Sequence, residues 1–302
     1  MFKLRYGFLI SGIITGSILL FTFLASFPDG NLHIFFCDVG QGDAAYIRFP
    51  DGRDMLIDGG PDTKVIGCLS RHMPFWDRHI DIVALSHPEK DHLQGLLSVF
   101  ERYAVDYFMR SDVSSTSDGY TELRALIVSK KITEQLVTQG QFVSLGSATV
   151  SVIWPSDEQI ARMHSPTGLS TLSGGSVLGT QTDANLNDGS LVFWLRYGTF
   201  DALFPGDADQ HVENYYTGDA LADAAVEVLK VPHHGSKTGM TQAFVDWLRP
   251  RVAVISVGKN SYGHPSPEAI AMLRSANSEV RRTDAGGDIE VVSDGTTWRV
   301  VK

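Results

Sequence analysis

Two kinds of hydrophobic pattern divide the chain. Residues 6–27 are apolar or small and uncharged throughout, whereas from residue 30 onward short apolar runs alternate with glycine-rich turns and with stretches of helical period. The first pattern is long enough to span a bilayer, and the second is typical of a domain that mixes strands with helices. We therefore expect an N-terminal segment at residues 1–29 and one α/β domain at residues 30–302.

The N-terminal segment resembles a membrane anchor. Lys3 and Arg5 precede the apolar run, and the run ends in "FLASF", a poor match to the small residues that a signal peptidase recognises. We favour an uncleaved transmembrane helix, with a cleaved signal peptide and a secreted domain as the alternative. Because basic flanks stay in the cytoplasm, the domain at residues 30–302 is expected outside the membrane.

The remaining pattern predicts alternating strands and helices. Three strands are expected within residues 32–60, with a turn at 50–52, and another strand at 81–86 runs into a helix at 93–103. A hairpin at 190–207 turns at Gly198. Further strands are expected at 225–231 and 250–258, and helices at 209–222, 238–248 and 266–277. The pattern weakens between residues 111 and 182, where the Ser/Thr/Gly-rich stretch 164–183 predicts a long surface loop that would serve as an active-site lid.

The composition of the chain argues against some classes of function. With 302 residues and 43% apolar side chains the chain can bury a substantial core, and its formal charge of −10 argues against coating nucleic acid through bulk basicity. The two cysteines, Cys37 and Cys68, are too few for a metal cluster. We expect buried free thiols, with a disulfide as the alternative in an oxidising compartment.

Polar residues follow several of the expected strands. "LSHPEKDH" places His87, Glu89, Asp91 and His92 within six positions after one strand. Two further loops also carry possible metal ligands directly after an expected strand. "LFPGDAD" carries Asp207, and "LKVPHHGS" carries His233 and His234. Loops at the carboxyl ends of adjacent strands converge in α/β proteins. These imidazoles and carboxylates suffice to bind two metal ions that share a bridging carboxylate.

At this point the sequence resembles a known family. The run HxxxDH, followed by "GDA" and "HHGS", is similar to the metallo-β-lactamase fold of metallohydrolases. Six motifs in order, from "DVGQGDAAYIRFPDGRDMLIDGG" through "SHPEKDHLQGL", "NLNDGSLVFWLRYG", "LFPGDAD" and "LKVPHHGS" to "VISVGKNSYGHP", resemble the extracellular domain of ComEC-type DNA-uptake proteins. The resemblance implies an αββα sandwich of two mixed β-sheets covered by helices, after an N-terminal transmembrane helix.

The resemblance also implies roles for individual residues. His87 would bind the first metal ion, Asp91 and His92 the second, and Asp207 would bridge the two. His234 is expected as the last ligand, with His233 as the alternative ligand or as a group that transfers protons. The residues expected to take part in the chemistry itself are Asp91, Asp207, His233 and His264. Residues expected to line the pocket or to orient the ligands are Asp43, Asp58, Asn187, Asp188, Ser190 and Lys237, while Lys230 and Lys259 would add positive charge nearby unless they are simply solvated.

Two departures from the wider metallohydrolase pattern affect the metal. Glu89 stands where a second histidine is usual, and the loop before residue 191 offers Asn187, Asp188 and Ser190 in place of a histidine. ComEC-type domains share this kind of exchange. Fewer imidazoles and more oxygen ligands favour a harder ion, so we expect one or two divalent ions, Zn²⁺ or Mn²⁺.

These expectations lead to a functional hypothesis. The chain would be a metal-dependent hydrolase, and we expect a phosphodiesterase or nuclease that acts on DNA outside the cytoplasmic membrane, in a competence role like that of ComEC. One alternative is a hydrolase of a small-molecule or envelope phosphoester or of a lactam. Another is a metal-binding module without catalytic activity. DNA or another phosphodiester, and the membrane, are the expected partners.

Overall fold

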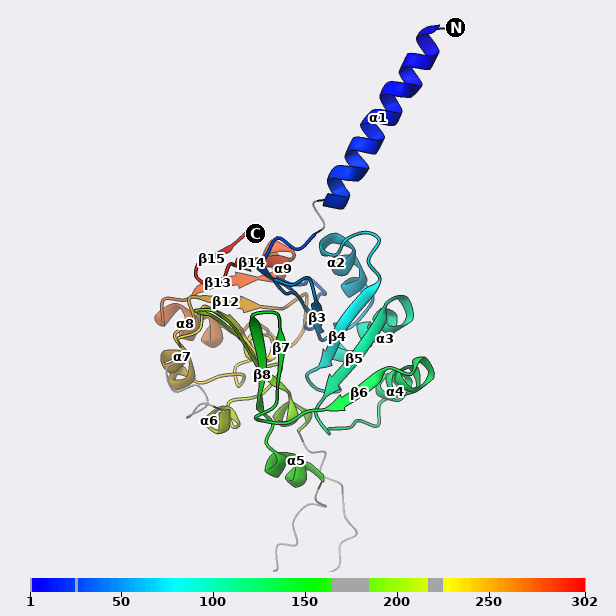
Figure 1. The fold of residues 1–302 in the computed structure, drawn as a ribbon. Helices are drawn as coiled ribbons and strands as arrows, with labels where there is room; N and C mark the ends of the chain where they lie inside the picture. Colours follow the sequence, from blue (N-terminus) through cyan, green and yellow to red (C-terminus); the bar gives the residue numbers. More distant parts are fainter. Residues whose placement is uncertain (1, 25–26, 165–184, 217–224, 302) are drawn as a thin grey trace, which may run out of the picture.

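Two β-sheets face each other, and helices cover the outer face of each sheet (Figure 1). This computed structural model describes residues 2–24, 27–164, 185–216 and 225–301. In spatial order the first sheet contains β15 (Trp298–Val300), β14 (Ile289–Ser293), β1 (Leu32–Phe36), β2 (Ala45–Arg48), β3 (Asp54–Ile57), β4 (His79–Leu85), β5 (Ala104–Arg110) and β6 (Thr133–Leu136). The second contains β13 (Glu279–Arg282), β12 (Val252–Ile255), β11 (Val228–Lys230), β10 (Phe200–Phe204), β9 (Val192–Tyr197), β8 (Ala148–Trp154) and β7 (Phe142–Leu145).

Both sheets are mixed. The pairs from β3 to β6 and from β10 to β13 are parallel, and the other pairs are antiparallel. Parallel neighbours end at the same edge of a sheet, so the loops that follow β3 and β4, and those that follow β10 and β11, emerge together. The α/β sandwich with two mixed sheets is therefore confirmed.

Three layers of apolar side chains hold the sandwich together. Along β1, Leu32, Ile34 and Phe36 point between the two sheets, while Phe35 points toward the helices on the outer face. This alternation follows from the two-residue period of a strand. The helices of the first sheet are α2 (Lys64–His72), α3 (Lys90–Arg102) and α4 (Asp118–Lys130), and those of the second are α6 (Glu213–Tyr216), α7 (Gln242–Leu248) and α8 (Pro267–Ser275).

Most predicted elements are present. The strands expected within residues 32–60, at 81–86 and in the hairpin around Gly198 are found, as are the helices α3, α7 and α8. Thr241 and Ser266 cap α7 and α8, because each side chain accepts a backbone N–H three residues on. Of the helix expected at 209–222, the described part is α6 alone, and residues 217–224 lie outside the described residues.

The weakly patterned middle of the chain is more regular than expected. Residues 111–164 contain α4, β6, β7, β8 and α5 (Asp157–His164). Strand β6 has a largely exposed burial pattern, which explains why its sequence lacks the apolar alternation of a core strand. Apart from His164, the expected lid at 164–183 lies outside the described residues.

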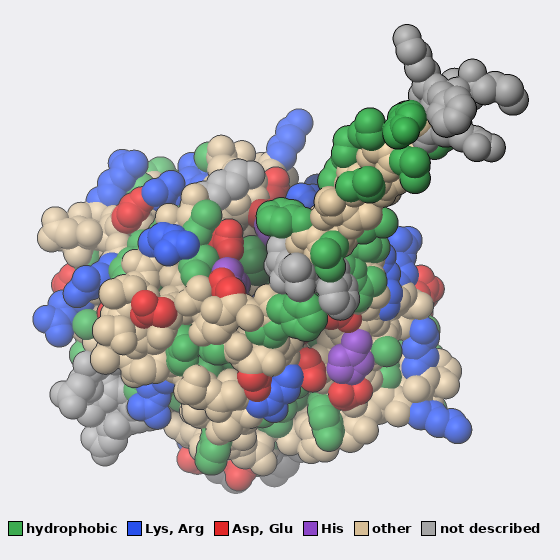
Figure 2. Space-filling view, turned by 45° about the horizontal axis from the view of Figure 1, so that its top comes forward, with side chains coloured by type: hydrophobic (Ala, Val, Ile, Leu, Met, Phe, Trp, Pro, Cys, Tyr) green, Lys and Arg blue, Asp and Glu red, His purple; other side chains and the backbone are tan. Residues whose placement is uncertain are grey.

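The N-terminal segment forms α1 (Phe2–Leu24), which projects from the body of the protein (Figure 1). Its side chains from residue 6 to residue 22 are exposed, and Figure 2 shows hydrophobic side chains along the projecting helix, beside a body that mixes acidic and basic ones. In the described part of the chain, no helix is long and apolar enough to cross a membrane. The expected transmembrane helix is therefore not confirmed.

The expectation of free thiols is wrong. Cys37 and Cys68 form a disulfide, with their Cα atoms 5.8 Å apart. Cys37 directly follows β1, and Cys68 lies in α2 on the outer face of the same sheet. The prediction failed because the packing of α2 on β1, which brings the two cysteines together, is a tertiary contact without a local signature. The bond fixes α2 to the start of the loop that leads to Asp43.

Candidate metal centre

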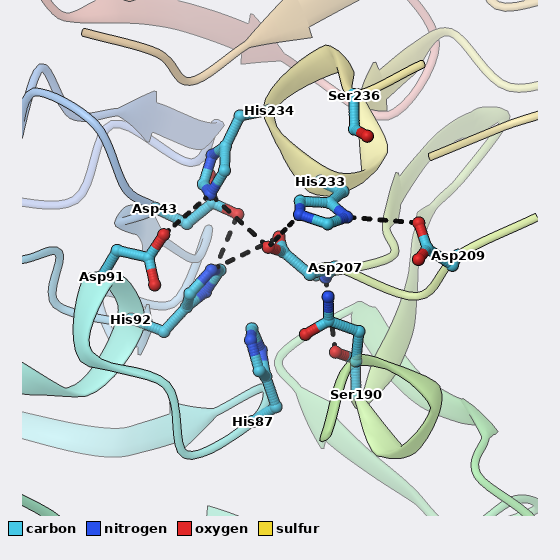
Figure 3. A network of polar contacts seen from close by, with 12 residues as sticks. Asp43, His87, Asp91, His92, Ser190, Asp207, Asp209, His233, His234 and Ser236 are labelled. Carbon is cyan, nitrogen blue, oxygen red and sulfur yellow. Dashed lines mark hydrogen bonds and ion pairs between the residues drawn. The ribbon is translucent and has the colours of Figure 1, made fainter. Parts of the chain in front are cut away.

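Loops from the two sheets converge at one edge of the sandwich (Figure 3). Asp58 follows β3, His87 and His92 follow β4, and Asp207 follows β10. A short 3₁₀ turn after β11, η3 (Pro232–Gly235), adds His233 and His234. The sandwich therefore brings together side chains that its sequence places after separate strands.

Asp207 lies at the centre of this group. Its Oδ1 atom is 3.3 Å from His92 Nε2, and its Oδ2 atom is 3.5 Å from His234 Nε2 and 3.8 Å from His233 Nε2. The carboxylate is buried, and its backbone N–H donates to Ser190 Oγ at 3.4 Å. In three histidines from two different loops, the Nε2 atom therefore points toward one carboxylate.

The far side of the His92 ring is held by Asp58. His92 Nδ1 lies 2.8 Å from Asp58 Oδ2, and the Ser86 backbone N–H donates to Asp58 Oδ1 at 2.7 Å. A carboxylate in this position fixes the tautomer that carries hydrogen on Nδ1. The lone pair of His92 Nε2 then faces Asp207.

The other two histidines are oriented in the same way. The Nδ1 atom of His234 lies 2.9 Å from the Ser256 carbonyl oxygen, and that of His233 lies 3.2 Å from Asp209 Oδ1. Both histidines have left-handed backbones, with φ of 53° at His234 and 47° at His233. A residue with a Cβ adopts this region at a cost of roughly 1–2 kcal/mol, and such strain is characteristic of functional sites.

His87 and Asp91 complete the group of predicted ligands. His87 is buried, its ring centroid lies 4.1 Å from that of His92, and its Nδ1 lies 3.1 Å from Ser86 Oγ. Asp91 lies in the first turn of α3, where its Oδ2 is 3.3 Å from His234 Nε2. The structure thus places both residues beside the Asp207 cluster.

The residues that depart from the usual ligand pattern differ in burial and in their contacts. Asn187, in the 3₁₀ turn η1 (Leu186–Gly189), and Ser190 are buried, and Ser190 contacts Asp207, whereas Asp188 pairs at 3.2 Å with His211. Glu89 caps α3 without a capping hydrogen bond. Burial, and then the charges of Asp91 and Asp207, raise the pKa of Glu89.

Three further residues of the predicted site lie at different distances from the cluster. The His264 ring is 5.6 Å from that of His233, so His264 borders the cluster. Asp43 lies within it, since one ligand atom each from Asp43, His92, Asp207 and His234 lie within 4.8 Å of one another. Lys237 is exposed and pairs with Glu268 at 3.2 Å, so it contributes no charge to the cluster.

Two residues that matter to the site were not assigned from the sequence, and a third, Lys230, was expected only to add positive charge nearby. Ser86 and Asp209 hold ligand histidines, and Lys230 pairs with Asp43 inside the sandwich. Ser86 and Asp209 stand next to predicted ligands, and that adjacency was the one signal in the sequence. The role of Lys230 depends on the pairing of two sheets and has no comparable signal.

The protonation of the cluster reflects burial and mutual charge. Burial raises the pKa of the Asp207 carboxyl, but His234 and His92 hold it well below its usual value. Burial lowers the pKa of His234, but Asp207 and Asp43 raise it to about 10. For His87, burial and then His92 lower the pKa to about 3. A proton and a cation would therefore compete for His234, while His87 is neutral and ready to act as a ligand.

The donor set fits a divalent metal ion. The Nε2 atoms of His87, His92 and His234, and the Oδ1 atoms of Asp207 and Asn187, are buried without a hydrogen-bond partner in the described part of the chain. Each such atom costs about 1–3 kcal/mol if left unsatisfied. Imidazole nitrogen and carboxylate oxygen are ligands of Zn²⁺ and Mn²⁺. A cation held among these atoms would satisfy them together.

A larger cavity lies elsewhere. It has a volume of about 720 Å³ and opens between the sheets beside β6 and β7, where Leu136, Phe142 and Val152 line it. None of the metal-binding candidates lines this cavity. The chemistry of the donor atoms, rather than cavity size, identifies the functional site.

No family model matches the chain, but known proteins resemble it in sequence and in fold. ComE operon protein 3 of Bacillus subtilis is 26% identical over 309 residues, covering 92% of this chain and 36% of that protein. Recombination protein 2 of Haemophilus influenzae is 32% identical over 259 residues, covering 84% of this chain and 28% of that protein. The chain thus spans about a third of the length of these relatives.

The fold is shared with a solved structure. The metallo-β-lactamase fold protein YhfI of Bacillus subtilis superimposes with a TM-score of 0.53 at 11% identity, covering 86% of this chain and 99% of YhfI. The sandwich, the ligand loops at its edge and the competence-protein relatives agree with one another. The chain therefore has the metallo-β-lactamase fold, and its sequence is related to the ComEC-type competence proteins.

Proposed function

We propose that this domain is a metal-dependent phosphodiesterase that cleaves DNA. The observation that carries the proposal is the arrangement around Asp207, where the Nε2 atoms of His92, His234 and His233 lie 3.3 to 3.8 Å from a single buried carboxylate. The name of one relative, a recombination protein, favours DNA among phosphodiesters.

The residues divide into those that hold the ion and those that border the substrate. His87, Asp91, His92, Asp207 and His234 would hold a divalent ion, which when bound supplies Lewis-acid polarisation of a phosphoryl oxygen and activation of water. We assign the transfer of a proton to or from the substrate to a side chain that does not hold the ion.

That group is His233. Its side chain is 25% exposed, whereas those of His92 and His234 are at most 1% exposed. Asp209 holds its Nδ1, which leaves Nε2 free to exchange a proton with an oxygen that departs at the open side of the cluster. His264 lies beside it and is the second candidate for contact with substrate.

The acidic surface is consistent with recognition through the metal. The chain has a formal charge of −10, Lys237 is paired with Glu268, and Lys230 is buried. Phosphate binding would then depend on the ion rather than on a basic groove, so affinity for DNA should depend less steeply on salt than in proteins that bind through many lysines.

The test is a cleavage assay on the purified 302-residue chain. Labelled single- and double-stranded DNA is incubated with Mn²⁺, with Zn²⁺ or with a chelator, and Asp207→Asn is compared with Asp246→Asn, the same change at an exposed carboxylate of α7. We expect cleavage by the wild type and by Asp246→Asn, loss with chelator, and loss of at least ~100-fold in Asp207→Asn. Cleavage that survives in Asp207→Asn would refute the site.

The same assay separates the alternatives. A protein that cleaves a chromogenic phosphodiester but leaves DNA intact would be a hydrolase of smaller substrates. A protein that binds metal and cleaves neither would be a binding module without catalytic activity. Either result would replace the DNA phosphodiesterase assignment.

We also propose that the domain acts outside the cytoplasm. The Cys37–Cys68 disulfide supports this location, because disulfides persist in oxidising compartments and are rare in the cytosol. The exposed apolar side chains of α1 support attachment to a membrane at its outer surface. Protease added to intact spheroplasts should degrade the domain, and protection until the cells are lysed would contradict the proposal.

A further inference from the structure

Lys230 is a buried lysine beside the candidate metal centre, and its side chain is 5% exposed. It is the last residue of β11. In this strand Val228 points between the sheets and Leu229 points toward the outer helices. Because side chains alternate along a strand, Lys230 projects between the sheets, on the same face as Val228.

Asp43 reaches the same space from the other sheet. It stands two residues before Ala45, which begins β2 and belongs to the layer between the sheets. The loop is fixed from behind, because the Asp43 N–H donates to the Asp91 carbonyl at 3.1 Å. Lys230 Nζ and Asp43 Oδ2 form an ion pair there. Opposing sheets thus bring a buried ammonium and a buried carboxylate into contact.

The ammonium also contacts the loop that carries the central carboxylate. Lys230 Nζ donates to the Gly206 carbonyl oxygen at 3.1 Å and lies 3.8 Å from Asp207 Oδ1. A positive charge at that distance opposes a cation bound to Asp207. Lys230 therefore competes with a metal ion for the negative charge of this site.

Asp43 lies beside two imidazoles, with its Oδ1 3.4 Å from His234 Nδ1 and its Oδ2 3.8 Å from His92 Nδ1, and two further cations could pair with its carboxylate. One is Lys230, and the other is a metal ion, since Asp43 has a ligand atom within 4.8 Å of those of His92, Asp207 and His234. A carboxylate that is paired with an ammonium donates weakly to a metal. Without the ammonium, the buried carboxylate would need another cation.

We propose that Lys230 is a positioning residue that sets the metal preference of the centre by holding Asp43 out of the ligand set. Removal of the ammonium adds a charged oxygen ligand to a set of imidazoles and carboxylates. Oxygen ligands favour Mn²⁺ over Zn²⁺. The inference rests on the metal-dependent function proposed above, but it concerns which ion binds and not whether DNA is cleaved.

The test measures metal binding without substrate. The 302-residue chain is dialysed to equilibrium against Zn²⁺ or Mn²⁺, and the bound metal is measured by mass spectrometry to give the ratio of the two dissociation constants. Lys230→Met should shift this ratio toward Mn²⁺ by at least ~10-fold. Lys230→Arg, which keeps the charge, and the double variant Asp43→Asn/Lys230→Met, which lacks the added ligand, should stay within ~3-fold of the wild type.

Two results would overturn the proposal. One is an unchanged ratio in a Lys230→Met protein with a native circular dichroism spectrum, and the other is a shift that persists in the double variant. If Lys230→Met does not fold, Lys230→Gln, which also removes the ammonium but keeps a polar end, decides by the same ratio.

Failures of the two proposals remain distinguishable. A protein that binds metal and shows the Lys230→Met shift but leaves DNA intact would refute only the phosphodiesterase function. A protein that cleaves DNA with a ratio insensitive to Lys230→Met would refute only the role of Lys230. A wild type that binds neither ion would refute both.

Discussion

Asp58 Oδ2 lies 2.8 Å from His92 Nδ1, while Nε2 of the same ring lies 3.3 Å from Asp207 Oδ1. Asp58 is itself fixed at the end of β3, where its backbone N–H donates to the Ala84 carbonyl oxygen at 2.8 Å. Its φ of 62° is left-handed, which is unusual for a residue with a side chain. A chain of contacts thus runs from the parallel pair of β3 and β4 to the centre of the site.

This relationship predicts a loss of metal affinity in Asp58→Asn. The amide removes the charge that holds hydrogen on His92 Nδ1, so the ring is less well oriented and less basic. We expect dissociation constants for Zn²⁺ and Mn²⁺ to rise about 10- to 100-fold, measured by equilibrium dialysis. The exposed Asp62→Asn on the same loop is the matched control. Equal affinities in the two variants would contradict the role of Asp58.

A second prediction concerns pH and a carboxyl group away from the metal centre. Asp54 is buried and accepts the Tyr46 hydroxyl at 2.8 Å. Burial raises its pKa from 3.8 to about 7; the Tyr46 hydrogen bond and Arg48 oppose this shift. Between these values the folded protein binds more protons than the unfolded chain, so stability falls as pH rises through this window and is constant above it.

Replacing Asp54 with Asn should remove this dependence. Relative to the wild type, Asp54→Asn should gain on the order of 1–3 kcal/mol of unfolding free energy between pH 4.5 and pH 8. Urea denaturation at both pH values, with chelator present to exclude metal effects, measures the difference. The exposed Asp157→Asn should follow the wild type. A wild-type stability that rises across this window, with Asp54→Asn parallel to it, would show that the carboxyl is ionised throughout.

The third prediction concerns the disulfide. Cys37 and Cys68 close a loop with a sequence separation of 31 residues, and opening such a loop typically costs about 2–4 kcal/mol. The chain in reducing agent, and a Cys37→Ala/Cys68→Ala variant, should therefore unfold at lower urea than the oxidised wild type. Mass spectrometry verifies the thiol state. If the oxidised and the reduced chain had the same urea midpoint of unfolding, the disulfide would not stabilise the fold.

The parts of the site that could be predicted from sequence are local. His87, Asp207 and His234 each stand within four residues of the end of a strand with an apolar pattern, so the motif and the strand appear in one stretch. The convergence of those strand ends then follows from parallel pairing. For this reason, residues far apart in the chain can be assigned to one cluster from the sequence alone.

The parts that could not be predicted depend on contacts between distant segments. The pairing of Lys230 with Asp43 requires β11 and β2 to lie in opposing sheets with both side chains turned inward, and neither strand shows this by itself. The disulfide depends in the same way on the docking of α2. The edge strand β6 was missed because solvent on both sides removes the apolar alternation by which strands are recognised.

The last prediction compares two glycines that both lie inside helices. At Gly95 in α3, a Cβ atom would collide with the Gly59 carbonyl, and the Gly95 N–H donates to the Gly60 carbonyl oxygen at 2.9 Å. At Gly67 in α2, a Cβ atom would meet only the end of the Arg71 side chain, at 3.3 Å. Backbone cannot move aside as a flexible side chain can, so the two positions should respond differently to the same added methyl group.

We expect Gly95→Ala to destabilise the protein by about 1–3 kcal/mol, whereas Gly67→Ala should be neutral or stabilising by up to ~1 kcal/mol because alanine favours helices. Urea denaturation measures both. Since α3 begins beside the centre and carries Asp91 and His92 in its first turn, Gly95→Ala should also weaken Zn²⁺ and Mn²⁺ binding, and Gly67→Ala should not. If Gly95→Ala were as stable as Gly67→Ala and bound metal equally well, α3 would not be packed against the loop at 59–62, and the position of His92 would have another cause.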